Sequence, residues 1–148
     1  MSVLRGNYPA KIDDKSRLKI PTAFRTFVEE HYGPDVYVTS IRGDSVRIYP
    51  LAVWVELERK LEHAASLDPA RQRFLARVSY FGQVAAIDRQ GRVVIHARLR
   101  ESADMSGEVD VLGQINFLEV WNHERFAAKL ERDPFTDDDA RELAKLGV

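Results

Sequence analysis

An internal repeat limits what this chain can fold into more than any other feature of its sequence. Residues 11–20, KIDDKSRLKI, recur at 86–95 as AIDRQGRVVI, and both segments keep Ile-Asp, an Arg four positions after the Asp and an Ile three positions after that Arg. Further matches follow in the same order: Phe24-Arg25 with Leu99-Arg100, Val36-Tyr37-Val38 with Val109-Asp110-Val111, Val46-Arg47-Ile48-Tyr49 with Leu118-Glu119-Val120-Trp121, and Trp54 with Phe126. The chain is therefore expected to contain two copies of one structural module.

Each copy has the pattern of a small unit built from strands and one helix. Alternating apolar and polar residues predict a strand at 8–12 and at 83–87, then a tight polar turn, then a second strand at 17–20 and at 92–95. A short helix and two more strands follow; in the first copy this helix starts at Pro21 or Thr22 and ends at Gly33-Pro34. A unit of about 45 residues buries too little apolar surface to be stable alone, so the two copies are expected to pair their sheets.

The segment between the copies is predicted to be helical. One amphipathic stretch follows Pro50, and a second begins at Asp68-Pro69, an N-cap followed by proline at the first helical position. A last helix is expected to begin at Thr136, with aspartates in its first turn. The predicted organisation is a first module at 3–53, a helical connector at 54–79, a second module at 80–128 and a C-terminal helical tail at 129–148. The fold class is α+β, with two pseudo-symmetric β modules intertwined in one chain.

Composition excludes several classes of protein. The 148 residues are 45% hydrophobic, which is enough for one core, and they contain neither a signal-peptide pattern nor an apolar run of about 18 residues. There is no cysteine, and the four histidines do not have metal-ligand spacing. We therefore expect a cytoplasmic protein with no membrane segment, no metal site and no cofactor.

Charge is distributed unevenly along the chain. The formal net charge is −1, which does not by itself indicate a nucleic-acid-binding protein, because contacts with phosphates need clustered Lys and Arg. Residues 1–25 carry six basic and two acidic side chains, and residues 84–100 carry four basic and one acidic, whereas residues 101–148 hold 5 basic and 12 acidic. Because the basic segments coincide with the two repeats, the repeats can form a local positive face.

The repeated turn carries the most specific chemistry. The carboxylate that opens each turn can accept backbone N–H groups, and Gly91 in the second copy tolerates a positive φ. Arg17 and Arg92 then begin the return strands, where each could pair with an aspartate as a structural clamp or could contact DNA, and the spacing leaves both roles open. Lys and Arg alternate with apolar residues through 11–20, so the basic side chains are expected to face outward on a two-stranded ribbon.

These residues resemble the MraZ family, the repressors encoded at the head of the bacterial division and cell-wall gene cluster. The resemblance covers about residues 3–130 and rests on Arg5-Gly6, the two Asp-to-Arg turns with their strands, Val111-Leu112-Gly113 and Leu118-Glu119-Val120-Trp121. It implies AbrB-like swapped-hairpin modules, a location in the cytoplasm and nucleoid, and a ring-shaped homo-oligomer, an octamer. It also implies a sequence-specific DNA-binding transcriptional regulator, a repressor that binds direct repeats in double-stranded DNA upstream of its own operon.

The resemblance also assigns roles to individual residues. It implies DNA contacts by Arg5, Lys11, Lys15, Arg17 and Arg92. We expect Arg89 to contact DNA as well, and Asp13 and Asp88 to structure their turns. Ser16 departs from the family pattern, which usually has Gly there, and His96 stands where the first copy has Pro21. Since Ala85 and Ala86 replace the basic residue found at Lys11, the first half is expected to supply most of the DNA affinity and the second mainly to support the fold and ring.

Two other classes of protein compete with a regulator. AbrB-like hairpins also occur in antitoxins and other protein-interaction modules, and the acidic tail from Asp133 could contact a partner, although a duplicated domain is unusual there. Catalysis would have to use the carboxylates at 13–14 or 137–139, or Ser79 with His123. None of these lies on a glycine-rich phosphate loop, a nucleophile elbow or a metal motif, so the chain is not expected to be an enzyme.

Overall fold

The computed structural model describes residues 3–148, which form an α+β fold of eight strands and six helices. The strands are β1 (Leu4–Lys11), β2 (Arg17–Lys19), β3 (Asp35–Thr39), β4 (Val46–Pro50), β5 (Gln83–Ala86), β6 (Arg92–Val94), β7 (Glu108–Ile115) and β8 (Leu118–Asn122). The helices are α1 (Thr22–His31), α2 (Leu51–Glu62), α3 (Pro69–Tyr80), α4 (Ala97–Ser102), α5 (His123–Arg132) and α6 (Asp137–Ala144). None of the helices in this part of the chain is long and apolar enough to cross a membrane.

The two copies exchange strands in one six-stranded sheet. Its order is β1-β7-β8-β4-β3-β5, so the first strand of each copy pairs with the third strand of the other copy, antiparallel in both cases. Replacing each strand by its repeat counterpart gives the same order read backwards, which is the property of a pseudo-twofold arrangement. The expected pairing of the two modules is therefore present, and neither copy contains a complete sheet of its own.

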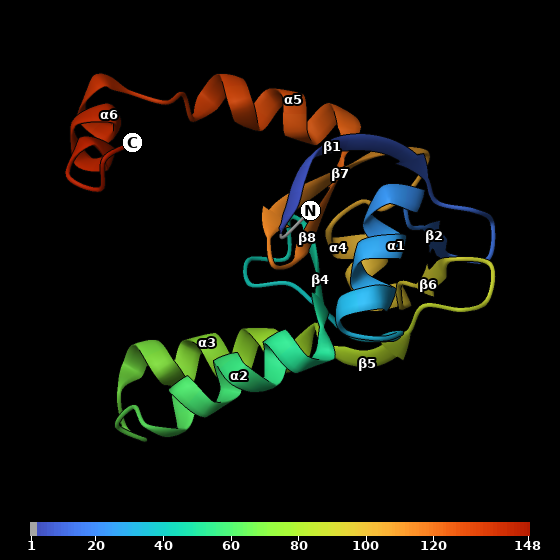
Figure 1. Cartoon of the computed structure of the whole chain (residues 1–148), viewed down its shortest axis with the longest axis horizontal. Coiled ribbons are helices and arrows are strands. Elements are labelled where there is room, and N and C mark those ends of the chain that lie inside the picture. Colours follow the sequence, from blue (N-terminus) through green and yellow to red (C-terminus); the bar gives the residue numbers. More distant parts are fainter. Residues whose placement is uncertain (1–2) are drawn as a thin grey trace.

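A second, two-stranded sheet joins the copies again, because β2 pairs with β6 in an antiparallel ribbon. In Figure 1 the six-stranded sheet curves round α1 and α4, and the ribbon closes the opposite side of the body. Matched side chains fill the space between them: Phe24 of α1 and Leu99 of α4 are both completely buried, as are Leu18 and Val93 of the ribbon. One core therefore serves both copies, as the small size of each module requires.

The connecting helices form a hairpin that extends from the body (Figure 1). As predicted, Asp68 caps α3 by accepting a hydrogen bond from Ala70 N at 2.8 Å, and proline follows it. The hairpin is attached by a small aromatic cluster in which Trp54 stacks on Tyr37 of β3, with ring centroids 4.5 Å apart. The Tyr37 hydroxyl also donates to the Val78 carbonyl at 2.9 Å, which fixes the end of α3 against the sheet.

The C-terminal segment contains one helix that was expected and one that was not. Thr136 begins α6 as predicted, in a reciprocal capping box with Asp139. Helix α5 was not expected from the sequence, and Asn122 caps it by accepting from Arg125 N at 3.1 Å. Figure 1 shows that α5 and α6 extend from the body on the same side as the α2–α3 hairpin, whereas the loops that precede β2 and β6 lie on the opposite side.

Candidate nucleic-acid interface

The two repeated turns have the same backbone construction. In the first, Asp13 Oδ1 accepts from the backbone N–H groups of Lys15 and Arg17, both at 2.9 Å. In the second, Asp88 Oδ1 accepts from Gln90 N at 2.8 Å and Arg92 N at 2.9 Å. These backbone hydrogen bonds, above all the one from the Arg at the end of each turn, lower the pKa of both carboxyl groups. Each aspartate thus organises its own turn, in the way the sequence pattern predicts.

The arginines that end the turns have different side-chain partners. Arg17 Nε donates to Asp13 Oδ2 at 2.8 Å, so this side chain is clamped within its own hairpin, although its side chain remains 29% exposed. Arg92 Nη1 instead donates to the neutral Gln90 side chain at 2.5 Å, and Arg92 forms no ion pair among residues 3–148. Arg17 therefore pairs with an aspartate as a structural clamp, whereas Arg92 does not.

Each turn closes on the other copy through its fourth residue. Ser16 and Gly91 both have left-handed backbones, with φ of 63° and 80°. The Ser16 carbonyl accepts from Ile95 N at 2.9 Å, and the Gly91 carbonyl accepts from Ile20 N at 2.8 Å. Serine thus takes the same conformation as glycine at the equivalent position, so the departure at Ser16 leaves the backbone of the turn unchanged.

A second pair of arginines supports the turns from across the pseudo-twofold. Arg25 of α1 reaches the second turn and donates from Nη2 to the Arg89 carbonyl at 2.8 Å, and it also pairs with Glu29 at 2.9 Å. Its counterpart, Arg100 of α4, donates to the Ser16 hydroxyl. Sequence reasoning did not place either residue in the site, although both occupy matched positions in the repeat. That match was the signal that could have found them.

The departure at His96 has a structural consequence outside the turns. His96 stands immediately before α4 without making a side-chain cap, and its Nε2 lies 2.7 Å from the Phe81 carbonyl. The imidazole therefore joins the start of α4 to the end of α3, a contact that proline at this position could not make.

The outer face of the ribbon is basic. Lys19 lies directly opposite Arg92 and Arg17 opposite Val94, while Leu18 and Val93 between them are completely buried. Direct partners in an antiparallel pair share a face, so all three basic side chains are on the side away from the core. The predicted alternation of buried apolar and outward basic residues is present in β2 and β6. The ribbon, however, pairs β2 with β6 of the other copy, whereas the strand before the first turn, β1, belongs to the six-stranded sheet and pairs with β2 only at the bridge between Ile12 and Leu18.

The remaining predicted contact residues are placed at different distances from the ribbon. Lys15 and Arg89 are exposed within the two turns and form no ion pair in the described part of the chain. Lys11 ends β1 close to the first turn, opposite Glu108. Arg5 lies opposite Gln114 near the other end of the same strand, about 20 Å from Lys11 at the usual rise per residue. The structure therefore brings the turn residues and Lys11 together and separates Arg5 from them.

This basic ribbon is suited to contacting phosphates. Within residues 3–148, the cations on or beside it that form no ion pair include Lys15, Lys19, Arg89 and Arg92, and the aspartates of the turns are occupied by backbone N–H groups. Across residues 3–148, no three His, Asp or Glu side chains are grouped so that they could hold a metal ion. A two-stranded ribbon with outward Lys and Arg has the shape and charge to enter a major groove or to straddle it.

Comparisons with known proteins identify the family. A family model described as "MraZ protein, putative antitoxin-like" matches residues 3–78 and 83–146. A protein of Acidobacterium capsulatum named "Transcriptional regulator MraZ" is 42% identical over 146 residues, covering 99% of this chain and 100% of the relative. A protein of the same name from Koribacter versatilis is 43% identical over 147 residues with the same coverage, and one from Tolumonas auensis is 30% identical over 88% of this chain and 87% of its own length. The chain therefore belongs to the MraZ family.

Proposed function

We propose that this chain is a transcriptional regulator that binds double-stranded DNA through the basic ribbon and the two turns beside it. The observation that carries the proposal is the outward face of β2 and β6, where Lys19 and Arg92 are adjacent and form no ion pair in the described residues. The names of the curated relatives, "Transcriptional regulator MraZ", support the regulatory part of the proposal.

The proposal extends to what the family resemblance implies. We propose a repressor of the division and cell-wall gene cluster, located in the cytoplasm and nucleoid, that assembles as a ring and binds direct repeats. We also propose that residues 3–53 and 80–128 are AbrB-like swapped-hairpin modules; the strand exchange β1–β7 and β5–β3 supports this assignment. Several identical ribbons on one ring would bind spaced repeats with high effective concentration, which compensates for the few cations on each subunit.

The charges predict the size of the salt effect. Four cations per subunit, each neutralising one phosphate, give a slope of about −3.6 in log affinity against log salt, so affinity falls roughly 150-fold for a fourfold rise in salt. Removing one such cation should reduce the slope by about 0.9 for each bound subunit. Lys15 and Arg89 are suitable positions because both are exposed and lie in equivalent turns.

The test is binding of the full chain to a duplex from upstream of its own gene, beside a scrambled duplex, across a salt series. Tighter binding to the native duplex, weakening steeply with salt, is expected, and charge reversal at Lys15 should weaken it more than charge reversal at Arg89. Arg42 provides a matched control because it is an exposed cation in the β3–β4 loop, where it lines a hollow with Lys129 and Asp133 of the C-terminal segment. Equally weak binding to both duplexes would refute DNA recognition and favour a protein-interaction module, and equal effects of Lys15 and Arg89 would refute the dominance of the first half.

A further inference from the structure

The C-terminal arm, residues 123–148, leaves the body of the molecule without packing on it beyond its first turns. Every residue from 130 to 142 is exposed, and neither α5 nor α6 contains a buried residue. The arm as a whole also exposes large apolar side chains, including Phe135 at 69% and Leu146 at 76% exposure. These side chains are not covered by the described part of their own chain and are available to a partner.

The helix at the end of this arm is too short to be stable by itself. α6 has eight residues, whereas isolated helices below about 12–15 residues are marginal in water. Its capping box with Thr136 and Asp139 supplies local hydrogen bonds but buries no apolar surface. Burial of its apolar side chains against another molecule would therefore stabilise α6 further.

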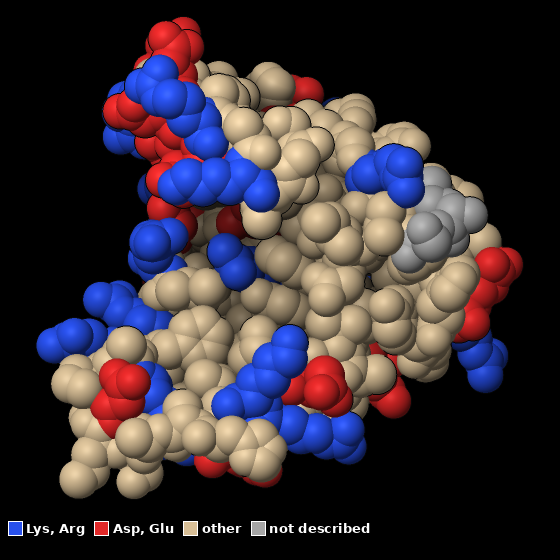
Figure 2. Space-filling view, turned by 60° about the vertical axis from the view of Figure 1, so that its left-hand side comes forward, with Lys and Arg blue, Asp and Glu red and all other residues tan. Residues whose placement is uncertain are grey.

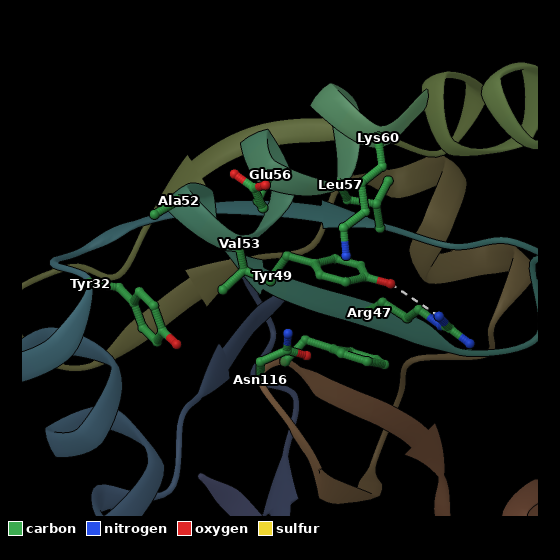
Figure 3. Close-up of a pocket in the computed structure, with 10 residues that line it drawn as sticks. Tyr32, Arg47, Tyr49, Ala52, Val53, Glu56, Leu57, Lys60 and Asn116 are labelled. Carbon is green, nitrogen blue, oxygen red and sulfur yellow. Dashed lines mark hydrogen bonds between the residues drawn. The ribbon is translucent and has the colours of Figure 1, made fainter. Parts of the chain in front are cut away.

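An apolar pocket with a basic rim lies on the α2–α3 side of the molecule (Figure 3). It has a volume of about 530 Å³ and is formed where α2 faces β4 and the β7–β8 turn. Tyr49 and Phe117 stack in it with centroids 4.6 Å apart, and Leu57 adds an aliphatic wall. Figure 3 shows the Lys60 side chain reaching over Tyr49, and Arg47 lying beside it with a hydrogen bond of 3.0 Å to the Tyr49 hydroxyl.

The charges of the pocket rim and of the arm are complementary. Residues 133–148 carry five acidic and two basic side chains; of the aspartates on either side of Phe135, Asp133 pairs with Lys129 at 3.4 Å, whereas Asp137 forms no ion pair within residues 3–148. At the rim, Lys60 forms no ion pair within residues 3–148, and the one acidic lining residue, Glu56, is paired with Arg59 at 3.1 Å. Helix α3 adds three arginines and no acidic residue to the same hairpin. An acidic segment with an apolar side chain at its centre therefore fits this pocket.

We propose that the arm of one copy docks on the α2–α3 hairpin of a second copy, with Phe135 seated in the pocket and Asp137 facing Lys60. Figures 1 and 2 show that the arm and the hairpin project from the same side of one subunit with a hollow between them, open to an arm from outside. This contact is heterologous, because it joins the arm of one copy to the hairpin of another, and each copy carries both surfaces. Repeating it head to tail closes a ring if the rotation between neighbouring subunits permits. This inference rests on the proposed self-association and names its interface.

The first test compares the assembly of wild-type protein with two apolar-to-serine variants by sedimentation velocity over a concentration series. Phe135→Ser removes the side chain that the pocket would bury and should raise the concentration for half-assembly by about tenfold or more. Val84→Ser is the matched control, since Val84 is 62% exposed on β5, and it should assemble like the wild type. A wild-type chain that is monomeric would refute self-association itself, whereas an oligomeric wild type with an unaffected Phe135→Ser would refute only this interface.

A second test establishes which subunit supplies the arm. Because the chain has no cysteine, Phe135→Cys and Lys60→Cys introduce single reactive sites. Mixing these two single-cysteine proteins under mild oxidation should give mainly the mixed disulfide-linked dimer. In the double variant the expected product is a ladder of linked subunits, and an intramolecular disulfide in a monomer would overturn the proposal by showing that the arm folds back on its own pocket.

Discussion

Substituting Gly91 by alanine tests whether the left-handed turn conformation, rather than the residue type alone, stabilises the two repeats. At φ 80° a β-carbon costs about 1–2 kcal/mol, and reduced freedom of the unfolded chain returns about 0.4–1 kcal/mol of this. The added atom would also lie 3.0 Å from Arg25 Cδ and 3.1 Å from its Nη1. Arg25 must then shift by a few tenths of an ångström, which weakens its exposed hydrogen bond to the Arg89 carbonyl and adds up to about 0.5 kcal/mol. The expected loss is about 1.5 kcal/mol.

Urea unfolding measures this loss at one fixed protein concentration, because the stability of an assembling protein depends on concentration. Gly107→Ala is the control: its φ is 65°, and no atom lies within 4 Å of the added β-carbon, so it should show the backbone cost alone. Ser16→Ala should add no backbone cost, since a β-carbon is already present at φ 63°, and should lose only the hydrogen bond that the Ser16 hydroxyl accepts from Arg100. The reasoning fails if Gly91→Ala is as stable as the wild type, or if Gly107→Ala is the more damaging of the two.

Three further predictions concern the core and the titrating groups. Phe24 is completely buried with the Tyr8 ring edge-on at 5.0 Å, so Phe24→Ala should lower the free energy of unfolding by about 3–5 kcal/mol in the same assay; a loss below about 1 kcal/mol would contradict this packing. The pKa of His123 is raised by its hydrogen bond to Asp110 at 2.9 Å and by the negative charges of Asp110, Glu108 and Glu124. The contribution of this ion pair to folding stability is therefore fully present below the ordinary pKa of 6.5 and is lost as pH rises through the raised pKa. The stability difference between wild type and His123→Gln should accordingly shrink from about pH 5 to about pH 9. A difference that grows with pH would refute the raised pKa. The pKa of Asp13 is lowered by backbone hydrogen bonds, so the stability advantage of wild type over Asp13→Asn should be present above the ordinary pKa of 3.8 and vanish as pH falls through the lowered pKa. Acid titration followed by circular dichroism measures this loss. A stability difference that does not depend on pH would refute the prediction.

Features determined by nearby residues could be predicted from the sequence. The ribbon alternation places Leu18 and Val93 in the core because successive side chains of a strand point to opposite faces. The starts of α3 and α6 followed from Asp68 and Thr136, whose side chains satisfy free N–H groups within a few residues. The turn geometry followed from Asp13 for the same reason. Each of these features depends on interactions within one or two turns of chain.

Features that depend on distant partners could not be predicted in the same way. The hydrophobic pattern of β1 is compatible with pairing inside its own copy, and the observed register with β7 depends on contacts that span more than a hundred residues. One such contact is the close approach at Gly113, where a β-carbon would lie 2.4 Å from Arg5 N. The partners of Arg17 and Arg92 also differ because the third residue of each turn differs, with Gln90 accepting from Arg92 and Lys15 unable to accept. The motif spacing is identical in both, so spacing alone could not separate them.

The fold is close to twofold symmetric, but its cationic surface is not, and this difference bears on the DNA it would select. The backbones of the two turns superpose in their hydrogen bonding, yet the free cation of the first turn is its third residue, Lys15, and that of the second is its second residue, Arg89. A twofold-symmetric DNA-binding protein matches a palindromic site, because each half presents the same groups to equivalent phosphates. Because the two turns of one subunit carry their cations at different positions, a single subunit does not match a palindromic site. Equivalent contacts then recur only from one subunit to the next, and in a head-to-tail ring they recur in the same direction. Such a ring would favour direct repeats over inverted ones, in agreement with the proposed binding of direct repeats that the family resemblance implies.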